Sequence, residues 1–413
     1  MRYLNLLGYV AIPLAFVAHF FLRGHAQGGQ GGWEHGGATA TFVLAGLGVI
    51  PLAHLMGTAT EHLSEKAGPT WGGLLNASFG NAAELIIGII ALSKGYNSIV
   101  KASLTGSILG NLLLVGGGAM IVGGWGREKQ RFNASAAETS AGLLALGVAA
   151  MLFPAIFSAT AVSLHDPNLI SDEHSVSLGT SIVLIIVYGL GLLFTLKTHS
   201  HIFSPKPAES PEEPSGTSRL HQGWSIKHSL LMLLLASVGI AIIAELLVGS
   251  AEQMAQHLGW NNVFVGVILL AIIGNAAEHS TAIMLARHDD MDTAMTITYQ
   301  SSLQIALFAT PVLVLISAAM AAMHIGNARF MDLMFTPMEV VAVVLTVGIV
   351  TILGRDGETN WFEGVMLIGL YLILAIAFFF MPQVPEEDGK HRPQNIQLAP
   401  PPPVAPAASA VPG

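Results

Sequence analysis

The sequence predicts an all-α integral membrane protein with about eleven transmembrane helices, each of about 20 residues. Hydrophobic residues make up 52% of the 413-residue chain and charged residues only 10%, and the mean hydropathy is +0.62. Soluble domains carry about 25% charged residues, so this composition favours a polytopic membrane protein. A further observation is a repeat: the motif GNAAE from Gly80 to Glu84 recurs from Gly274 to Glu278, inside a second apolar segment.

Composition and missing motifs exclude several classes of function. The net charge of -9 is spread along the chain, and no basic patch indicates nucleic acid. The absence of cysteine removes disulfides, thiolate metal sites and thiol chemistry. The sequence contains no HExxH or GxSxG motif, so an intramembrane hydrolase or other membrane enzyme is only a remote alternative.

Apolar runs place the predicted helices along the chain. In order, they lie near 4–22, 39–58, 72–93, 98–123, 134–157, 175–196, 226–249, 262–286, 293–323, 333–353 and 361–381. The first run follows only Arg2 and lacks a small-residue cleavage site, which favours a retained helix over a signal peptide. The long 293–323 run is expected to include an interfacial extension.

Two polar stretches divide the chain. Residues 204–216 are rich in proline, serine and glutamate and cannot cross lipid, so they predict a linker between two halves. The chain after Pro382 is polar and rich in proline and alanine, which predicts disorder. The expected organisation is an N-terminal extra helix (1–30), a first repeat (31–203), a cytoplasmic Pro-rich acidic linker (204–225), a second repeat (226–382) and a disordered tail (383–413).

Basic residues predict the orientation. With a cytoplasmic N-terminus, eleven of the seventeen lysines and arginines fall on the cytoplasmic side and six on the other. Glu84 then lies on a helix that runs outward and Glu278 on one that runs inward, so the two motif segments are inverted. Ser107 follows Glu84 by 23 residues, and Ser301 follows Glu278 by the same 23. Inverted repeats commonly build alternating-access transporters.

The repeated motif offers ligands for a hard cation. A carboxylate near the bilayer centre costs roughly 2.5–3.5 kcal/mol, so two copies indicate an ion pathway. Asn81 and Glu84 are three residues apart, as are Asn275 and Glu278, and each pair shares one helix face. The weak helix formers Gly-Asn predict a break that frees backbone carbonyls. Such an oxygen set suits calcium better than softer metals.

The same two glutamates predict a counter-ion. Without a cation, paired buried carboxylates are poorly solvated and repel each other, which raises their affinity for protons. Two protonated glutamates are neutral, and so is one divalent ion between two carboxylates. Both loaded forms can therefore rearrange in the membrane, whereas the doubly charged empty form cannot. This asymmetry predicts obligatory exchange of a divalent cation for protons.

Four segments resemble the signatures of a known family. The runs from Gly72 to Leu85 and from Gly106 to Val115 are similar to the first signature of the calcium/proton exchangers in the cation/calcium antiporter superfamily. The runs from Gly274 to His279 and from Ser301 to Phe308 are similar to the second. The resemblance implies one extra N-terminal helix plus two inverted five-helix repeats. It also implies that Glu84 and Glu278 carry both the metal and the protons.

The resemblance implies further site residues. The polar positions that line the pathway in the family correspond to Asn81, Asn275, Ser107, Ser301, Ser302 and Gln304, and His279 matches the histidine after the second glutamate. Each has a structural alternative: helix-to-helix hydrogen bonds for the amides, packing for the serines, and a satisfied interior position for His279. Glu245 and Glu339 also fall in predicted helices but lack a repeat partner.

Two features depart from the family pattern. The acidic segment between the halves is reduced to Glu209, Glu212 and Glu213 within a Pro-rich stretch, which argues against regulation by it. Gln300 stands before Ser301 where a small residue is usual, four residues before Gln304 and on the same helix face. If Gln300 faces the pathway, its replacement by glycine should shift the relative uptake of calcium and manganese; otherwise it only packs.

The predicted function is exchange of Ca²⁺ for H⁺ by alternating access, with no cofactor besides the transported ions. Alternatives with the same fold are a Na⁺/Ca²⁺ exchanger and a Mn²⁺ or other divalent/H⁺ exchanger. The expected partners are Ca²⁺, protons and the lipid bilayer, with no nucleic acid, and the sequence is compatible with a homo-oligomer. A bacterial inner membrane is the expected location, although a vacuolar member would look similar.

Overall fold

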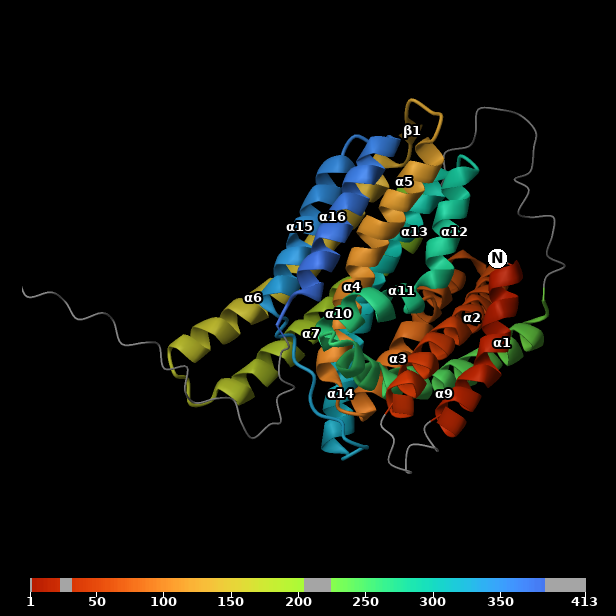
Figure 1. Ribbon diagram of the computed structural model, residues 1–413. Coiled ribbons are helices and arrows are strands. Elements are labelled where there is room, and N and C mark those ends of the chain that lie inside the picture. Colours follow the sequence, from red (N-terminus) through yellow and green to blue (C-terminus); the bar gives the residue numbers. More distant parts are fainter. Residues whose placement is uncertain (1, 23–31, 204–223, 383–413) are drawn as a thin grey trace, which may run out of the picture.

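The computed structural model describes residues 2–22, 32–203 and 224–382, and these residues are almost entirely helical (Figure 1). Eight helices of this part of the chain are long and apolar enough to cross a membrane, and three shorter apolar helices span 6–20, 82–93 and 337–353. Together they match the eleven predicted segments. The predicted tail, and the predicted linker apart from residues 224 and 225, lie outside the described residues.

The helices follow the predicted order. The chain begins with α1 (Arg2–Val17) and η1 (Ala18–Leu22). The first repeat contains α2 (Gly32–Phe79), α3 (Ala82–Ser93), α4 (Asn97–Leu109), η3 (Gly110–Val115), α5 (Gly116–Gly124), α6 (Ala134–Ser163), α7 (Leu169–Leu193), η4 (Phe194–Thr198) and α8 (Ser200–Phe203). The second contains α9 (Ile226–Leu258), α10 (Asn262–Phe264), η5 (Val265–Leu270), α11 (Ala271–Gly274), α12 (Ala276–Arg287), α13 (Met291–Gln304), η6 (Ile305–Ala309), α14 (Thr310–Ala322), α15 (Pro337–Leu353) and α16 (Trp361–Phe379).

The long α2 consists of two helices joined at Gly68. Gly68 has φ 81° and ψ 171°, a conformation outside the helical region that only glycine adopts readily. The chain turns back so tightly that a Cβ on Gly72 would lie 2.2 Å from the carbonyl oxygen of Ser64. This turn separates the predicted second and third transmembrane segments.

The two repeats match with a constant offset of 194 residues, the separation of Glu84 and Glu278. With this offset, α3 corresponds to α12, and α4 corresponds to α13. The π-helical turns η3 and η6 also fall at equivalent positions. The contacts between the two repeats follow the same correspondence. Helix α3 packs on α9 as α12 packs on α2, and α5 packs on α16 as α14 packs on α7.

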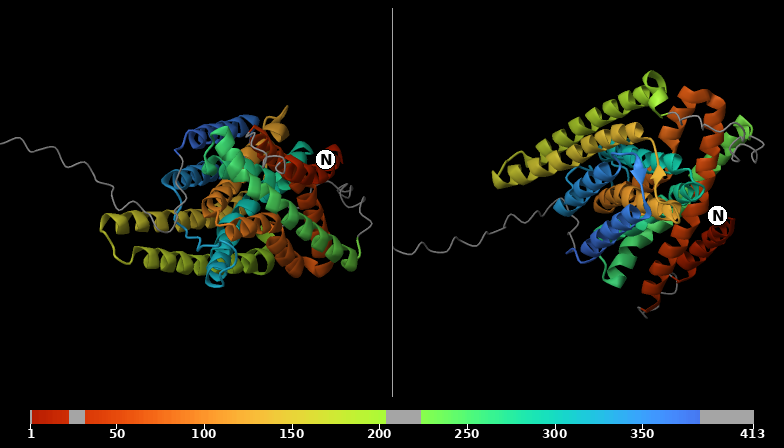
Figure 2. Two further views of the ribbon diagram at one scale, coloured as in Figure 1. Left: turned by 60° about the horizontal axis from the view of Figure 1, so that its bottom comes forward. Right: turned by 90° about the horizontal axis from the view of Figure 1, so that it is seen from above.

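Burial differs strongly among the helices. The continuous helix from 97 to 124 is mostly enclosed by its neighbours, whereas α6 and α7 form a long pair that reaches beyond the rest (Figure 2). Exposed aliphatic side chains such as Ile182, Ile186 and Leu190 cover α7. In a helix of this length and hydropathy such a surface suits contact with lipid hydrocarbon.

One end of the bundle carries a short ribbon between the repeats. Strand β1 (Gln130–Arg131) pairs antiparallel with β2 (Glu358–Thr359) near the ends of α5, α12 and α16 (Figure 1). Glu358 binds Lys129 at 2.7 Å and Arg131 at 3.1 Å. The hydrogen bond from Lys129 holds the pKa of Glu358 below its usual range. Arg127 pairs with Asp289 at 3.2 Å at the same end, which is therefore rich in basic residues.

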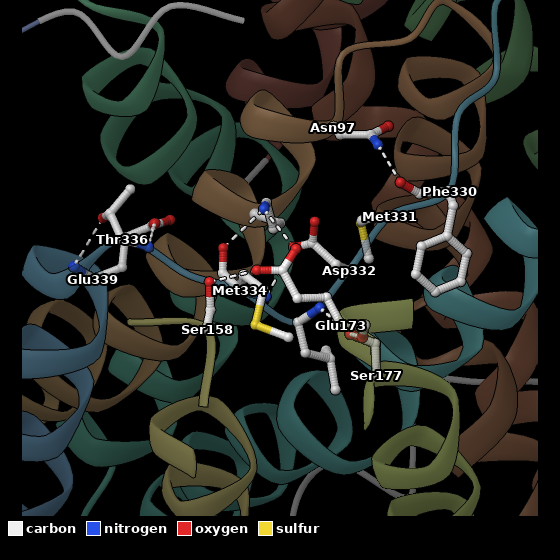
Figure 3. Close-up of polar contacts among 12 residues, drawn as sticks. Asn97, Ser158, Glu173, Ser177, Phe330, Met331, Asp332, Met334, Thr336 and Glu339 are labelled. Carbon is white, nitrogen blue, oxygen red and sulfur yellow. Dashed lines mark hydrogen bonds and ion pairs between the residues drawn. The ribbon is translucent and has the colours of Figure 1, made fainter. Parts of the chain in front are cut away.

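The opposite end is closed by an extended segment, residues 327–336, which we term the strap (Figure 3). Lys101 Nζ donates to Asp332 Oδ1 and to the carbonyl oxygen of Met334, each at 2.9 Å. The backbone N–H of Leu333 donates to Ser177 Oγ at 3.0 Å. The strap buries Met331, which is 0% exposed. It thus ties α4 and α7 of the first repeat to the second.

Two acidic residues in predicted helices have structural partners. Glu339 forms a capping box with Thr336 at the start of α15, and its carboxylate also accepts a hydrogen bond from Thr105 at 3.3 Å. Glu245 pairs with Lys94 at 2.5 Å.

Candidate ion-transport site

Both motif helices are interrupted at the predicted place. Asn81 (φ −102°, ψ 26°) precedes α3, and Asn275 (φ −99°, ψ 7°) precedes α12, so each glutamate lies in the first turn of a helix. A helix N-terminus favours a negative charge. The carbonyl oxygens of Asn81 and Asn275 accept from the N–H groups of Leu85 and His279. These two carbonyls are therefore engaged in helical bonds and are not the backbone ligands that such a break could free.

The two breaks bring the glutamates to one cavity. Glu84 and Glu278 both line a cavity of about 900 Å³, together with Gly80 and Gly274. A Cβ placed on Gly274 would lie 3.7 Å from Glu84 Cγ and 3.8 Å from Glu84 Oε1. The second motif therefore passes directly beside the first glutamate, and a Cβ at position 274 would be in van der Waals contact with it.

The two asparagines are held by hydrogen bonds that cross between the repeats. Asn81 Nδ2 donates to Gln304 Oε1 at 2.7 Å, and Asn275 Nδ2 donates to Ser107 Oγ at 2.8 Å. Their exposed fractions are 0% and 1%, and neither Oδ1 has a hydrogen-bond partner among the described residues. Buried polar atoms are rarely left unpaired. Each amide thus has an unpartnered oxygen in the same helical turn as a glutamate, but neither asparagine itself lines the cavity.

The remaining predicted residues take different places. Ser301 lines the cavity and forms a hydrogen bond with the Glu278 carboxylate, and Gln304 also lines the cavity. Ser302 is fully buried and donates to the carbonyl oxygen of Thr298 in its own helix at 2.9 Å. His279 is buried, and its Nε2 lies 3.2 Å from Asn111 Oδ1. Ser302 and His279 are therefore placed by helix packing outside the cavity wall.

The cavity has polar lining that the motifs did not identify. One face of α2 contributes His54, Thr58, Glu61 and Glu65. These positions follow the helical spacing of three and four residues, which is the signal that could have grouped them. Gln300 also lines the cavity.

The cavity opens toward only one end of the bundle. Its outer walls include Glu65, Gly68 and Leu196, near the basic end. Toward the strap, Glu84 instead borders a gap of about 20 Å³, lined mainly by aliphatic groups and by Ser103 and Ser107. A space of this size holds about one water molecule. The two carboxylates are therefore accessible from one side of the protein and closed off on the other.

The donor atoms at this site are oxygens. The described residues contain no group of three or more His, Cys, Asp or Glu side chains arranged for a metal. The site instead combines two carboxylates with amide and hydroxyl oxygens. Calcium accepts six to eight such oxygens in flexible geometry and often keeps water ligands, which a cavity of this volume can supply.

Comparison with known proteins identifies the family of the chain. A family model described as sodium/calcium exchanger protein matches residues 37–197 and 228–380. The chain is 43% identical over 381 residues to the Ca(2+)/H(+) antiporter of Synechocystis sp., covering 90% of this chain and 96% of that protein. It is 41% identical over 356 residues to the vacuolar calcium ion transporter of Schizosaccharomyces pombe, with 85% and 82% covered.

Solved structures show the same architecture. The structure of native YfkE superposes with a TM-score of 0.71 at 35% sequence identity, covering 92% of this chain and all of that chain (100%). The crystal structure of the H+/Ca2+ exchanger CAX superposes with a TM-score of 0.61 over 92% of this chain and 91% of that one. At 12% identity, the second likeness supports the fold alone.

Proposed function

Because the chain belongs to the sodium/calcium exchanger protein family, within its calcium/proton exchangers, we propose that it exchanges Ca²⁺ for H⁺ by alternating access. It is an integral membrane transporter rather than an enzyme. In this proposal Glu84 and Glu278 bind either the cation or protons. The observation that carries it is the meeting of two equivalent carboxylates at the head of one cavity that is closed on its far side.

Charge balance explains why these two groups would couple the ions. Moving two uncompensated carboxylates through a low-dielectric protein interior costs several kcal/mol per ion. One Ca²⁺ or two protons cancels the pair of charges, so either load lets the protein change state. The unloaded protein does not change conformational state, because its site remains doubly charged. Transport of one ion without the other is thereby prevented.

Neighbouring groups have supporting roles in this proposal. The unpartnered Oδ1 atoms of Asn81 and Asn275 would complete the oxygen set around calcium. Ser301 would orient the Glu278 carboxylate by donating a hydrogen bond to it. Gln304 and Ser107 would orient the two amides by accepting from their nitrogens. The carboxylates of Glu61 and Glu65, which line the cavity, would attract cations to its mouth.

The basic end of the bundle supports an orientation. The cavity opens toward the end that carries Arg127, Lys129 and Arg131. Cytoplasmic loops are enriched in lysine and arginine. We place this end, and the N-terminus with it, in the cytoplasm of a bacterial cell, with the protein in the inner membrane. The cavity then represents the inward-facing state.

Transport by the purified protein in liposomes tests the proposal. An imposed pH gradient in sodium-free buffer should drive uptake of labelled calcium. Glu84→Gln and Glu278→Gln should each abolish this uptake, because each variant removes one of two charges that balance the ion. Glu363→Gln is a matched control, because Glu363 also lies in the first turn of a helix but outside the cavity. It should retain transport.

Two results would contradict the proposal. Substantial uptake by either folded glutamine variant would remove the paired carboxylates from the mechanism. Strict dependence of calcium uptake on a sodium gradient would instead favour a Na⁺/Ca²⁺ exchanger, and uptake of manganese but not calcium would change the cargo. Folding is checked by gel filtration and thermal unfolding in detergent.

A further inference from the structure

The closed side of the protein depends on direct contact between two backbones. A Cβ placed on Gly106 of α4 would lie 2.0 Å from the carbonyl oxygen of Val267 in η5 and 2.5 Å from its carbonyl carbon. A Cβ on Gly266 would lie 2.5 Å from Ala102 Cβ. Real Cβ atoms do not approach this closely, so α4 and η5 can meet in this way only with glycine at position 106.

The 194-residue offset relates the closed gap to the open cavity. Glu84, Ser103 and Ser107 line the gap. Their counterparts in the second repeat are Glu278, Ile297 and Ser301, and all three line the cavity. The gap and the cavity are therefore equivalent spaces in the two repeats, one shut and one open.

The glycine of the closed contact has no glycine counterpart. The same offset pairs Gly106 with Gln300 and Val267 with position 73. On the open side, Gln300 lines the cavity. Suppose the cavity side closed by the equivalent contact, between positions 300 and 73. The Cβ of Gln300 would then clash with the backbone at position 73, just as a Cβ added to Gly106 would clash with the backbone of Val267. The side chain at 300 therefore prevents closure by that contact.

We propose that the Gly106–Val267 contact is the closure that seals the far side, and that Gln300 denies the same closure to the cavity side. This inference rests on the proposed alternating access. It assigns a conformational bias to the two positions: the protein rests with the cavity open because one repeat can form a backbone contact that the other cannot. Gln300 then acts on the equilibrium between the two states.

The absence of cysteine in the chain allows a direct test. Ser103→Cys reports on the sealed gap and Ile297→Cys on the open cavity, and neither position is a proposed ion ligand. Each single-cysteine protein is reconstituted in sealed vesicles of both orientations and treated with a membrane-impermeant maleimide. Without further change, Ile297→Cys should react from the cavity side, whereas Ser103→Cys should be protected from the other side.

Gly106→Ala should open the sealed side. We expect the labelling rate of Ser103→Cys to rise about tenfold, which corresponds to a shift of ~1.4 kcal/mol. Gly110→Ala is the matched control, one turn further along the same chain, where an added Cβ meets its nearest neighbour at 3.9 Å. It should leave both rates unchanged. A folded Gly106→Ala protein with unchanged labelling would overturn the proposal.

Gln300 provides a second arm that does not disturb a buried contact. Gln300→Gly should close the cavity side and lower labelling of Ile297→Cys about tenfold, the same ~1.4 kcal/mol. Gln300→Ala removes the long side chain but keeps the Cβ, so it should lower the labelling of Ile297→Cys far less than Gln300→Gly does. If both variants protect Ile297→Cys from labelling equally, the bulk of the Gln300 side chain and not a backbone contact decides closure, and the proposal is overturned. If neither variant protects Ile297→Cys, the proposal is overturned as well.

The labelling result separates this inference from the proposed function. Labelling requires neither calcium nor a proton gradient, so it reads the two states without transport. The expected labelling pattern in a protein that fails to exchange Ca²⁺ for H⁺ would uphold the closure contact and reject the cargo. Normal exchange with labelling that ignores Gly106 and Gln300 would reject the closure contact alone.

Discussion

The buried amide of Asn275 should contribute strongly to calcium affinity. Its Nδ2 donates to Ser107 Oγ at 2.8 Å and to the carbonyl oxygen of Ala271 at 3.0 Å, so its Oδ1 is fixed and has no partner in the described residues. Asn275→Ala removes this oxygen without changing either carboxylate. The maximal rate of exchange should therefore survive while the affinity falls.

The size of the effect follows from the contact that is lost. A hydrogen bond or similar polar contact to a charged group contributes about 1.5–3 kcal/mol. This corresponds to a rise of about 10- to 150-fold in the calcium concentration that gives half-maximal uptake. The assay is the calcium dependence of pH-driven uptake in liposomes, and thermal unfolding in detergent checks the fold.

Ser107→Ala is the control for Asn275→Ala. It removes the acceptor of the amide nitrogen but leaves the Asn275 oxygen in place, and the bond to Ala271 still orients the amide. Its effect on half-maximal uptake should be several times smaller. If both variants keep the wild-type calcium dependence, Asn275 is a packing residue. If Ser107→Ala has the larger effect, the serine is the ligand.

Two further predictions concern stability, both measured by thermal unfolding in detergent. Asn261 caps α10 through Phe264 N–H at 2.7 Å and donates to the carbonyl oxygen of Phe378 at 2.7 Å, so Asn261→Ala should cost about 2 kcal/mol; a loss no larger than that of the neighbouring Asn262→Ala would contradict it. Lys101→Met should destabilise the protein because Asp332 of the strap loses its cation. Combining it with Asp332→Asn should restore part of that loss, and strictly additive losses would mean that the pair is not coupled.

The sequence predicts the helices and the helix breaks well because their causes are local. Apolar runs of membrane-spanning length and the weak helix formers before Glu84 and Glu278 need no tertiary information. The sequence also contains a capping-box pattern at Thr336 and Glu339, which explains a glutamate that hydropathy alone placed inside a helix. Its carboxylate caps α15 and contacts Thr105.

The rest of the site depends on how distant segments meet. The pairing of Asn81 with Gln304, the position of Gly274 beside Glu84 and the course of the strap follow from the crossing of helices that are far apart in the chain. Periodicity along one helix cannot give the relative rotation of another. The same reason explains why Ser302, one residue from Ser301, faces its own helix and not the cavity.

The paired π-helical turns set the rotational phase of the helices that carry Ser107 and Ser301. Each such turn adds residues relative to an α-helix, and one residue corresponds to about 100° of rotation. Deleting one residue within η3 or η6 would therefore turn the pathway serine away from the face that the rest of the helix packs. The two turns also differ in side-chain support, because Thr310 Oγ1 donates to the carbonyl oxygen of Ile305 at 2.8 Å, whereas glycine occupies the equivalent position 116 in the first repeat. The π-helical turn of the first repeat therefore lacks the side-chain hydrogen bond that its counterpart has.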